Sequence, residues 1–156
     1  MRFDFSGLDV ADRTTRYYMH RIQVGGMTPY LVVRPATEAT KGYYNEVLKR
    51  VGKSARSANA GQLTPALVRD IRDDERRLYP RHIIVDWGYL DGEKDVPGVM
   101  LDADGKPVKF ALEACTAFLD ALPGWLFDDL RGFCGKNDNF VEEGEEPVDG
   151  VVAGQN

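Results

Sequence analysis

The sequence of 156 residues has few of the side chains that most often carry chemistry, with only two cysteines and two histidines. Cys115 and Cys134 are too few for a disulfide framework, so we expect two reduced thiols in the core. His20, His82 and the two cysteines stand far apart in the sequence, whereas a zinc site typically needs closely spaced ligands. We therefore expect no metal, no cofactor and no catalytic residue of these types.

Long hydrophobic runs and phosphate-binding loops are also missing. The apolar stretches are only a few residues long, against the roughly 20 that a membrane helix needs, so no membrane span is expected. Gly98 and Gly105-Lys106 lack the spacing and the hydroxyl of a phosphate loop. The run from Asp102 to Gly105 fits a hairpin turn better than a calcium loop. These absences favour a binding protein over an enzyme, although a small enzyme without a recognisable motif stays open.

Charge is plentiful but unevenly distributed. Residues 1–82 carry 15 Lys/Arg and 9 Asp/Glu, a net charge of +6, while residues 83–156 carry 5 and 16, a net charge of -11. An acidic total disfavours a dedicated nucleic-acid binder, because phosphate neutralisation supplies most non-specific affinity. The asymmetry would suit a homo-oligomer in which the basic end of one molecule meets the acidic end of the next.

The first half of the chain predicts a hairpin followed by two helices. Residues 1–15 show no sustained hydrophobic periodicity and are expected to form an irregular arm. Two runs rich in aromatic and β-branched residues, 17–24 and 30–34, flank a Gly-Pro turn and predict a β-hairpin. Helical spacing from about Thr37 to Gly52 predicts a helix, and the small polar residues 53–61 predict a flexible connection. Thr64-Pro65 opens a second helix, which must end before Pro80.

The second half predicts strands followed by two more helices. Residues 82–87 form the most strand-like run, and Gly88 is expected to end it. Residues 99–110 predict a second hairpin around Asp104-Gly105. Apolar residues at helical spacing predict a helix over 112–122 and, after Pro123-Gly124, another from Trp125 to Cys134. We thus predict a single α+β domain over residues 16–136. The Gly- and Glu-rich residues 137–156 are predicted to form an acidic flexible tail.

Seven of the nine Trp and Phe residues lie in the last 70 residues. Most of them are at strand or helix spacing and are expected in the core, but Trp and Phe also anchor protein-binding surfaces. The candidate protein-binding residues are Trp87, Phe110, Trp125, Phe127, Phe133 and Phe140.

The order of motifs over residues 82–140 resembles the tail assembly chaperone family of long-tailed bacteriophages. The motifs that carry this resemblance are Asp86-Trp87 at a strand end, the Asp104–Phe110 hairpin, the helix end Leu119–Pro123, the aromatic-rich Trp125–Leu130, and the late Asn139-Phe140. Residues 1–81 have no counterpart in the family pattern.

The resemblance implies a non-enzymatic protein of the host cytoplasm. Members of this family bind the long, hydrophobic tape measure protein, keep it soluble, and leave when tail tube subunits polymerise around it; a frameshifted longer form is common. The expected partners are therefore the tape measure protein or other phage tail proteins, for which an apolar groove that accepts a helix would be suitable. The alternative is a phage virion structural protein, such as a head–tail connector or a tail component.

Overall fold

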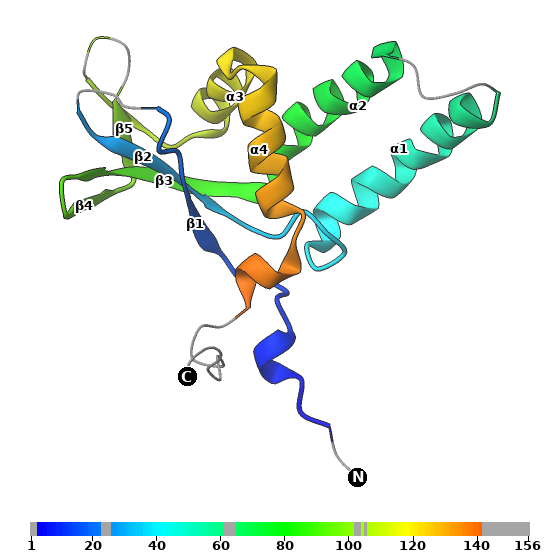
Figure 1. Ribbon diagram of the computed structural model, residues 1–156, viewed down its shortest axis with the longest axis horizontal. Coiled ribbons are helices and arrows are strands. Elements are labelled where there is room, and N and C mark those ends of the chain that lie inside the picture. Colours follow the sequence, from blue (N-terminus) through cyan, green and yellow to red (C-terminus); the bar gives the residue numbers. More distant parts are fainter. Residues whose placement is uncertain (1–2, 23–25, 61–64, 102–103, 105, 142–156) are drawn as a thin grey trace.

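The computed structural model describes residues 3–22, 26–60, 65–101, 104 and 106–141, and an antiparallel β-sheet lies at its centre (Figure 1). The strands of this sheet are, in their order across it, β1 (Thr15–Tyr18), β2 (Thr28–Val33), β3 (Ile84–Asp91) and β4 (Lys94–Pro97). A second, two-stranded sheet consists of β5 (Val99–Leu101) and β6 (Pro107–Lys109). Because β1 pairs with β2 and β5 with β6, both predicted hairpins are confirmed, although β1 covers Thr15–Tyr18 where the sequence predicted a strand over residues 17–24.

Helices make up the rest of the regular structure and confirm the α+β class. They are α1 (Lys41–Ala60), α2 (Pro65–Leu78), α3 (Leu112–Ala121) and α4 (Gly124–Cys134), with short 3-10 turns at Ser6–Leu8 and Asn137–Phe140 and a π-helical turn at Tyr79–Ile83. Prolines set several of the ends as predicted, since α2 begins at Pro65 and α4 directly follows Pro123. Among the described helices, none is both long enough and apolar enough to cross a membrane.

α3 and α4 pack against one face of the sheet. Tyr17, Leu31 and Trp87 are register partners across β1, β2 and β3 and form a row on that face. The ring of Tyr17 lies 5.1 Å from that of Phe133 in α4, and the ring of Trp87 lies 6.0 Å from that of Phe118 in α3. Figure 1 shows α1 and α2 extending together away from the sheet. The main core therefore lies between the sheet and the C-terminal helix pair.

α1 is longer than the sequence predicted. Instead of ending near Gly52, the helix continues to Ala60, so the flexible connection predicted over residues 53–61 is wrong for residues 53–60. Residues 53–60 are rich in Ala, Lys, Arg and Ser, which helices accept. Gly52, just before them, lowers the stability of the helix by only about 1 kcal/mol. Residues 61–64 lie outside the described part of the chain.

β3 passes through Gly88, where the sequence predicted a break. The strand begins at Ile84 rather than at His82, because the π-helical turn takes up the preceding residues. Gly88 is the register partner of Tyr30, and a Cβ atom there would lie 2.6 Å from the Tyr30 hydroxyl oxygen. The sequence signals gave no hint of β4, which is charged and contains Pro97, as is typical of an edge strand.

The N-terminal arm predicted over residues 1–15 is partly integrated into the fold. Val10 is buried in the main core, and Thr15 already belongs to β1. Only the residues around the 3-10 turn extend away from the body, as Figure 1 shows.

The tail predicted from residue 137 begins too early. Asn137 accepts a hydrogen bond at Oδ1 from the Thr37 hydroxyl at 2.7 Å, and Phe140 is buried with its ring 6.0 Å from that of Phe133. One apolar anchor and one long-range hydrogen bond are enough to hold this turn in place. The acidic residues 142–156 lie outside the described residues.

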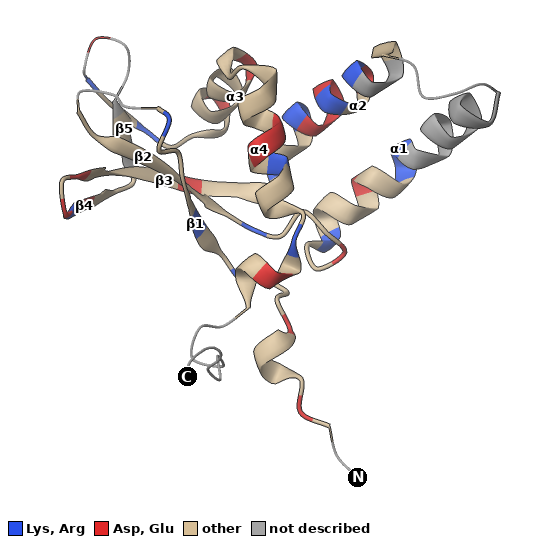
Figure 2. Ribbon diagram, in the orientation of Figure 1, with Lys and Arg blue, Asp and Glu red and all other residues tan. Residues whose placement is uncertain are grey.

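Two ion pairs join the basic first half of the sequence to the acidic second half. Arg16 Nη2 lies 2.6 Å from Asp95 Oδ2, and Arg72 Nη2 lies 2.7 Å from Asp128 Oδ2. Figure 2 shows both signs mixed along α2. Some charges of the two halves are therefore paired within one chain, and head-to-tail association of copies stays a prediction.

Candidate functional site

The six aromatic residues proposed as a protein-binding surface do not share one. Trp87 is only 2% exposed, and Phe127 and Phe140 are also buried in the main core. Phe110 and Phe133 are partly buried and pack against that core. Trp125, in the first turn of α4, is 56% exposed and is the one member of this set whose ring is largely free to contact a partner.

The motif residues of the second half instead form a single packed unit. Trp87 donates a hydrogen bond from Nε1 to the Val108 carbonyl at 3.1 Å, which ties β3 to the β5–β6 hairpin. The same ring packs edge-on against Phe110 at 5.3 Å and against Phe118 at 6.0 Å. These residues therefore hold the strands and α3 together, and the surface of this unit has to be sought beside them.

Nucleophilic chemistry at the two thiols is unfavourable. Cys115 and Cys134 are free and buried, as predicted. Burial raises the pKa of Cys115 to about 12 and raises that of Cys134 as well, so both remain protonated thiols near neutral pH. Within the described part of the chain, no group of three or more His, Cys, Asp or Glu side chains is placed to hold a metal ion.

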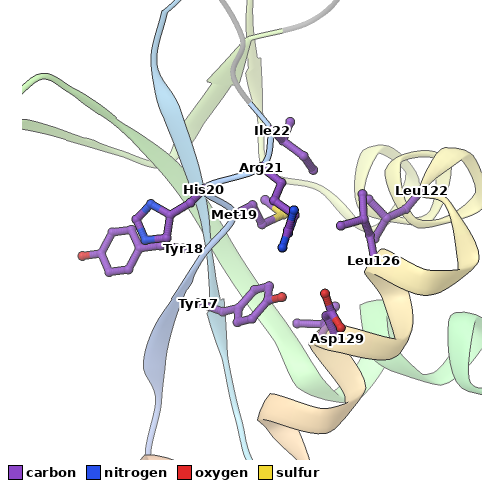
Figure 3. Close-up of a pocket in the computed structure, with 10 residues that line it drawn as sticks. Tyr17, Tyr18, Met19, His20, Arg21, Ile22, Leu122, Leu126 and Asp129 are labelled. Carbon is purple, nitrogen blue, oxygen red and sulfur yellow. The ribbon is translucent and has the colours of Figure 1, made fainter.

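A pocket of about 170 Å³ opens between β1, the turn that follows it, and the face of α4 that looks toward them (Figure 3). We call it the β1–α4 pocket; its lining residues are Tyr17, Tyr18, Met19, His20, Arg21, Ile22, Leu122, Leu126, Asp129 and Leu130. The side chains of Tyr17, Met19 and Arg21 point toward α4, while those of Tyr18 and His20 point to the opposite side of the strand. Tyr17 and Tyr18 point to opposite sides because they are neighbours in β1, and Met19 to Arg21 lie after the end of the strand and in the turn that follows it.

The polar groups of the β1–α4 pocket come from both of its walls. The Tyr17 hydroxyl points toward Asp129, as Figure 3 shows. Burial is the main cause that raises the pKa of Tyr17, and the negative charge of Asp129 adds to it, so this phenol stays neutral and can donate a hydrogen bond. The Arg21 guanidinium carbon lies 5.5 Å from the centre of the Trp125 ring, a cation–π contact. Apolar side chains, among them Met19, Ile22 and Leu126, make up much of the remaining lining.

α4 is held in place by Asp128, the residue directly before Asp129. Asp128 accepts hydrogen bonds from Arg72 Nε at 3.1 Å and Nη2 at 2.7 Å, and from Arg131 Nη1 at 3.2 Å. Burial alone would raise the pKa of Asp128, but the hydrogen bonds and charge of Arg72, with those of Arg131, lower it. At Gly124 a Cβ atom would lie 3.1 Å from Arg72 Nη1, so the glycine leaves room for this guanidinium.

Arg76 of α2 fixes the other wall of the pocket through the end of α3. Its guanidinium donates hydrogen bonds to the carbonyl oxygens of Leu119 and Leu122, the latter at 2.9 Å, and lies 5.0 Å from the centre of the Phe127 ring. Leu119 lies in the last turn of α3, where its carbonyl also accepts a hydrogen bond from the Leu122 N–H at 3.2 Å, and Leu122 directly follows the end of the helix. The α3–α4 corner that carries Leu122 is therefore set by a charged residue from α2.

A second titratable cluster joins α1 to α2. Tyr43 donates its hydroxyl hydrogen to Glu75, with both carboxylate oxygens 2.8 Å away. Burial raises the pKa of Glu75 above its usual 4.5, although the Tyr43 hydrogen bond and the Arg131 charge act in the opposite direction. Burial also raises the pKa of Tyr43. Because the two side chains are hydrogen-bonded to each other, we interpret this pair as a structural contact.

Sequence reasoning missed most of the pocket residues because their signals are those of a core. Tyr17, Met19 and Arg21 alternate within a run that the sequence predicted as a strand, and Leu126 and Asp129 recur at helical spacing. Both patterns predict buried faces. That the two faces leave a space between them depends on the angle at which α4 crosses the sheet, which no local pattern encodes.

No protein-family model matches the sequence, and neither a curated protein nor a solved structure shows significant similarity to it.

Proposed function

We propose that this chain is a phage tail assembly chaperone, a non-enzymatic protein that binds the tape measure protein in the host cytoplasm and keeps it soluble. The observation that carries the proposal is the order of motifs from Asp86-Trp87 to Asn139-Phe140, which resembles that family. The function then consists of transient binding, with release when the tail tube forms.

The packing of these motifs supports treating them as one unit. The Asp86-Trp87 end of the pattern is joined to the hairpin by the Trp87–Val108 hydrogen bond, and its Asn139-Phe140 end is joined to α4 by the contact of Phe140 with Phe133. Asn139 Nδ2 also donates to the Phe133 carbonyl at 2.8 Å. Motifs spread over more than 50 residues therefore each make a contact that holds the unit together.

Exposed apolar side chains support a protein-binding role. Trp125 and Leu112 are exposed on the C-terminal helices, Leu48 and Tyr44 on α1, and Phe3, Phe5 and Leu8 on the N-terminal arm. Burying such a side chain at an interface contributes roughly 1.5–3 kcal/mol, and Trp is enriched among residues that dominate binding. When a partner with exposed apolar helices binds these side chains, the apolar surfaces of both proteins are removed from water. The partner therefore becomes more soluble.

Co-expression with a tape measure fragment tests the proposal. We expect the soluble fraction of the fragment to rise severalfold when the full chain is present, compared with an unrelated soluble protein expressed at the same level. An unchanged soluble fraction would contradict the chaperone function. Persistence of the chain in purified virions would also contradict it and would support the structural-protein alternative.

A further inference from the structure

The β1–α4 pocket is too small for a cofactor but large enough for a side chain. Its volume of about 170 Å³ falls below the roughly 300–1,000 Å³ of pockets that hold drug-sized ligands. It is comparable to the roughly 150 Å³ apolar cavity that admits a benzene molecule. An apolar side chain such as Leu, Met or Phe is therefore the occupant that its size and lining favour.

Asp129 is one of the two charged residues that line the pocket, the other being Arg21. Asp129 is exposed, and none of the hydrogen bonds or ion pairs of the described residues engages its carboxylate. Arg21 keeps its positive charge over the Trp125 ring but forms no ion pair with Asp129, and Asp128 holds Arg72 and Arg131. The Asp129 carboxylate can therefore accept an ion pair from a positively charged group of a partner.

The spacing of the lining residues suits a helix as the partner. Leu126 and Asp129 lie at i and i+3 on α4, so Asp129 stands about one helical turn, roughly 5 Å, beyond Leu126. A partner helix lying along α4 places residues three or four apart at that same separation. An apolar residue seated in the pocket would then present the residue one turn away to Asp129.

We propose that the β1–α4 pocket binds an amphipathic helix of a partner protein, which inserts one apolar side chain into the pocket and pairs a Lys or Arg one turn away with Asp129. This inference deepens the proposed chaperone function and rests on it for the identity of the partner. The exposed Trp125 contacts the lining residue Arg21 and gives the interaction a spectroscopic signal.

Two designed peptides serve as probes. Both carry the same apolar helix face with a central leucine, and they differ only in having Lys or Glu four residues from it. Binding is followed by tryptophan fluorescence, in which Trp125 is the reporter because Trp87 is buried. We expect the Lys peptide to shift the emission to shorter wavelength and to bind about fivefold more tightly than the Glu peptide, since an exposed ion pair contributes up to about 1 kcal/mol.

Two variants assign the preference to Asp129. In Asp129→Asn the preference for Lys over Glu should fall below twofold, whereas Asp120→Asn, an exposed aspartate of α3 outside the pocket, should retain it. Equal melting temperatures of both variants and the wild type show that folding is unchanged. Equal binding of the two peptides, no binding of either, or a preference that survives Asp129→Asn would overturn the inference. Self-association that Asp129→Asn abolishes would also overturn it, because a second copy would then be the occupant.

The two proposals can fail separately. If tape measure solubility rises with the wild-type chain and equally with Asp129→Asn, the chaperone function stands and the pocket inference is wrong. If the Lys peptide binds as expected but the tape measure fragment stays insoluble, the pocket stands and its assignment to tail assembly is wrong.

Discussion

Asp128 and Asp129 are adjacent and chemically identical, but their surroundings give them different roles. Asp128 holds α4 to α2 through the Arg72 guanidinium, and Asp129 faces the β1–α4 pocket beside the Tyr17 hydroxyl. The sequence predicted neither role, because a pair of aspartates on an amphipathic helix has the same pattern as a solvated face. The difference arises from which neighbouring element each carboxylate meets.

Arg76 should be the more important of two adjacent arginines. Its guanidinium satisfies carbonyls at the end of α3, so Arg76→Ala should lower the free energy of unfolding by about 1.5–3 kcal/mol. Arg77, which is exposed, provides the matched control, and Arg77→Ala should change the free energy of unfolding by less than about 0.5 kcal/mol. Urea unfolding measures both, and equal effects of the two variants would contradict the assigned role of Arg76.

Glu75 should make stability depend on pH. Its pKa in the folded state lies above the usual value of 4.5, so the folded chain retains this proton at pH values where the unfolded chain has lost it. The Glu75 contribution is therefore most favourable below pH 4.5 and is lost as the pH rises through the folded-state pKa. Glu75→Gln keeps an acceptor for Tyr43 and removes the titration.

Denaturation of wild type and Glu75→Gln between pH 4 and pH 7 checks this sign. The stability of the variant relative to the wild type should increase with pH across that interval. Asp73→Asn, which replaces an exposed acid on the same helix, should show no such trend. A relative stability of Glu75→Gln that decreases with pH would show that the folded-state pKa of Glu75 is lowered instead.

At the scale of elements, the sequence predicted the helix ends that depend on local chemistry and missed features that depend on packing. Pro65 and Pro123 mark the starts of α2 and α4 because proline restricts the backbone wherever it stands. Gly88 was interpreted as a strand end, but it lies inside β3, where the Tyr30 ring crosses it. Only the neighbouring strand explains why a glycine stands there.

Two glycine substitutions should therefore act in opposite directions. In Gly88→Ala the new methyl group would meet the Tyr30 hydroxyl at 2.6 Å and the Val96 carbonyl at 2.7 Å, so we expect a loss of about 1–3 kcal/mol in the free energy of unfolding. Gly132 of α4 has nothing within 4 Å of an added Cβ, so Gly132→Ala should gain about 0.5–1 kcal/mol. Thermal unfolding of both variants measures the difference, and destabilisation of similar size in both would contradict the packing at Gly88.

The candidate site was predictable only in part at this scale. Trp125 was named from the sequence because large aromatic residues anchor interfaces, and the structure leaves it exposed. Phe127 belongs to the same helix but is fully buried, since it lies on the face of α4 that turns inward. Composition identified the aromatic residues, whereas the orientation of α4 decided which of them a partner could reach.

At the scale of the whole molecule, the charge asymmetry has a role within the chain. Arg16 with Asp95 and Arg72 with Asp128 join the basic first half to the acidic second half. If the other charges of the two halves drive head-to-tail association between copies, the mass measured by light scattering should fall as salt rises from about 0.05 to about 0.5 M. A mass that stays constant over this range would contradict such association.

Binding of the tape measure protein is the central claim, and co-purification tests it most directly. A tagged full-length chain is expressed with a tape measure fragment, captured through the tag and resolved by size-exclusion chromatography. We predict that wild type and Asp120→Asn elute together with the fragment as a soluble complex, and that Asp129→Asn retains markedly less of it. A fragment that never elutes with the wild-type chain, although both proteins are soluble, would contradict the claim.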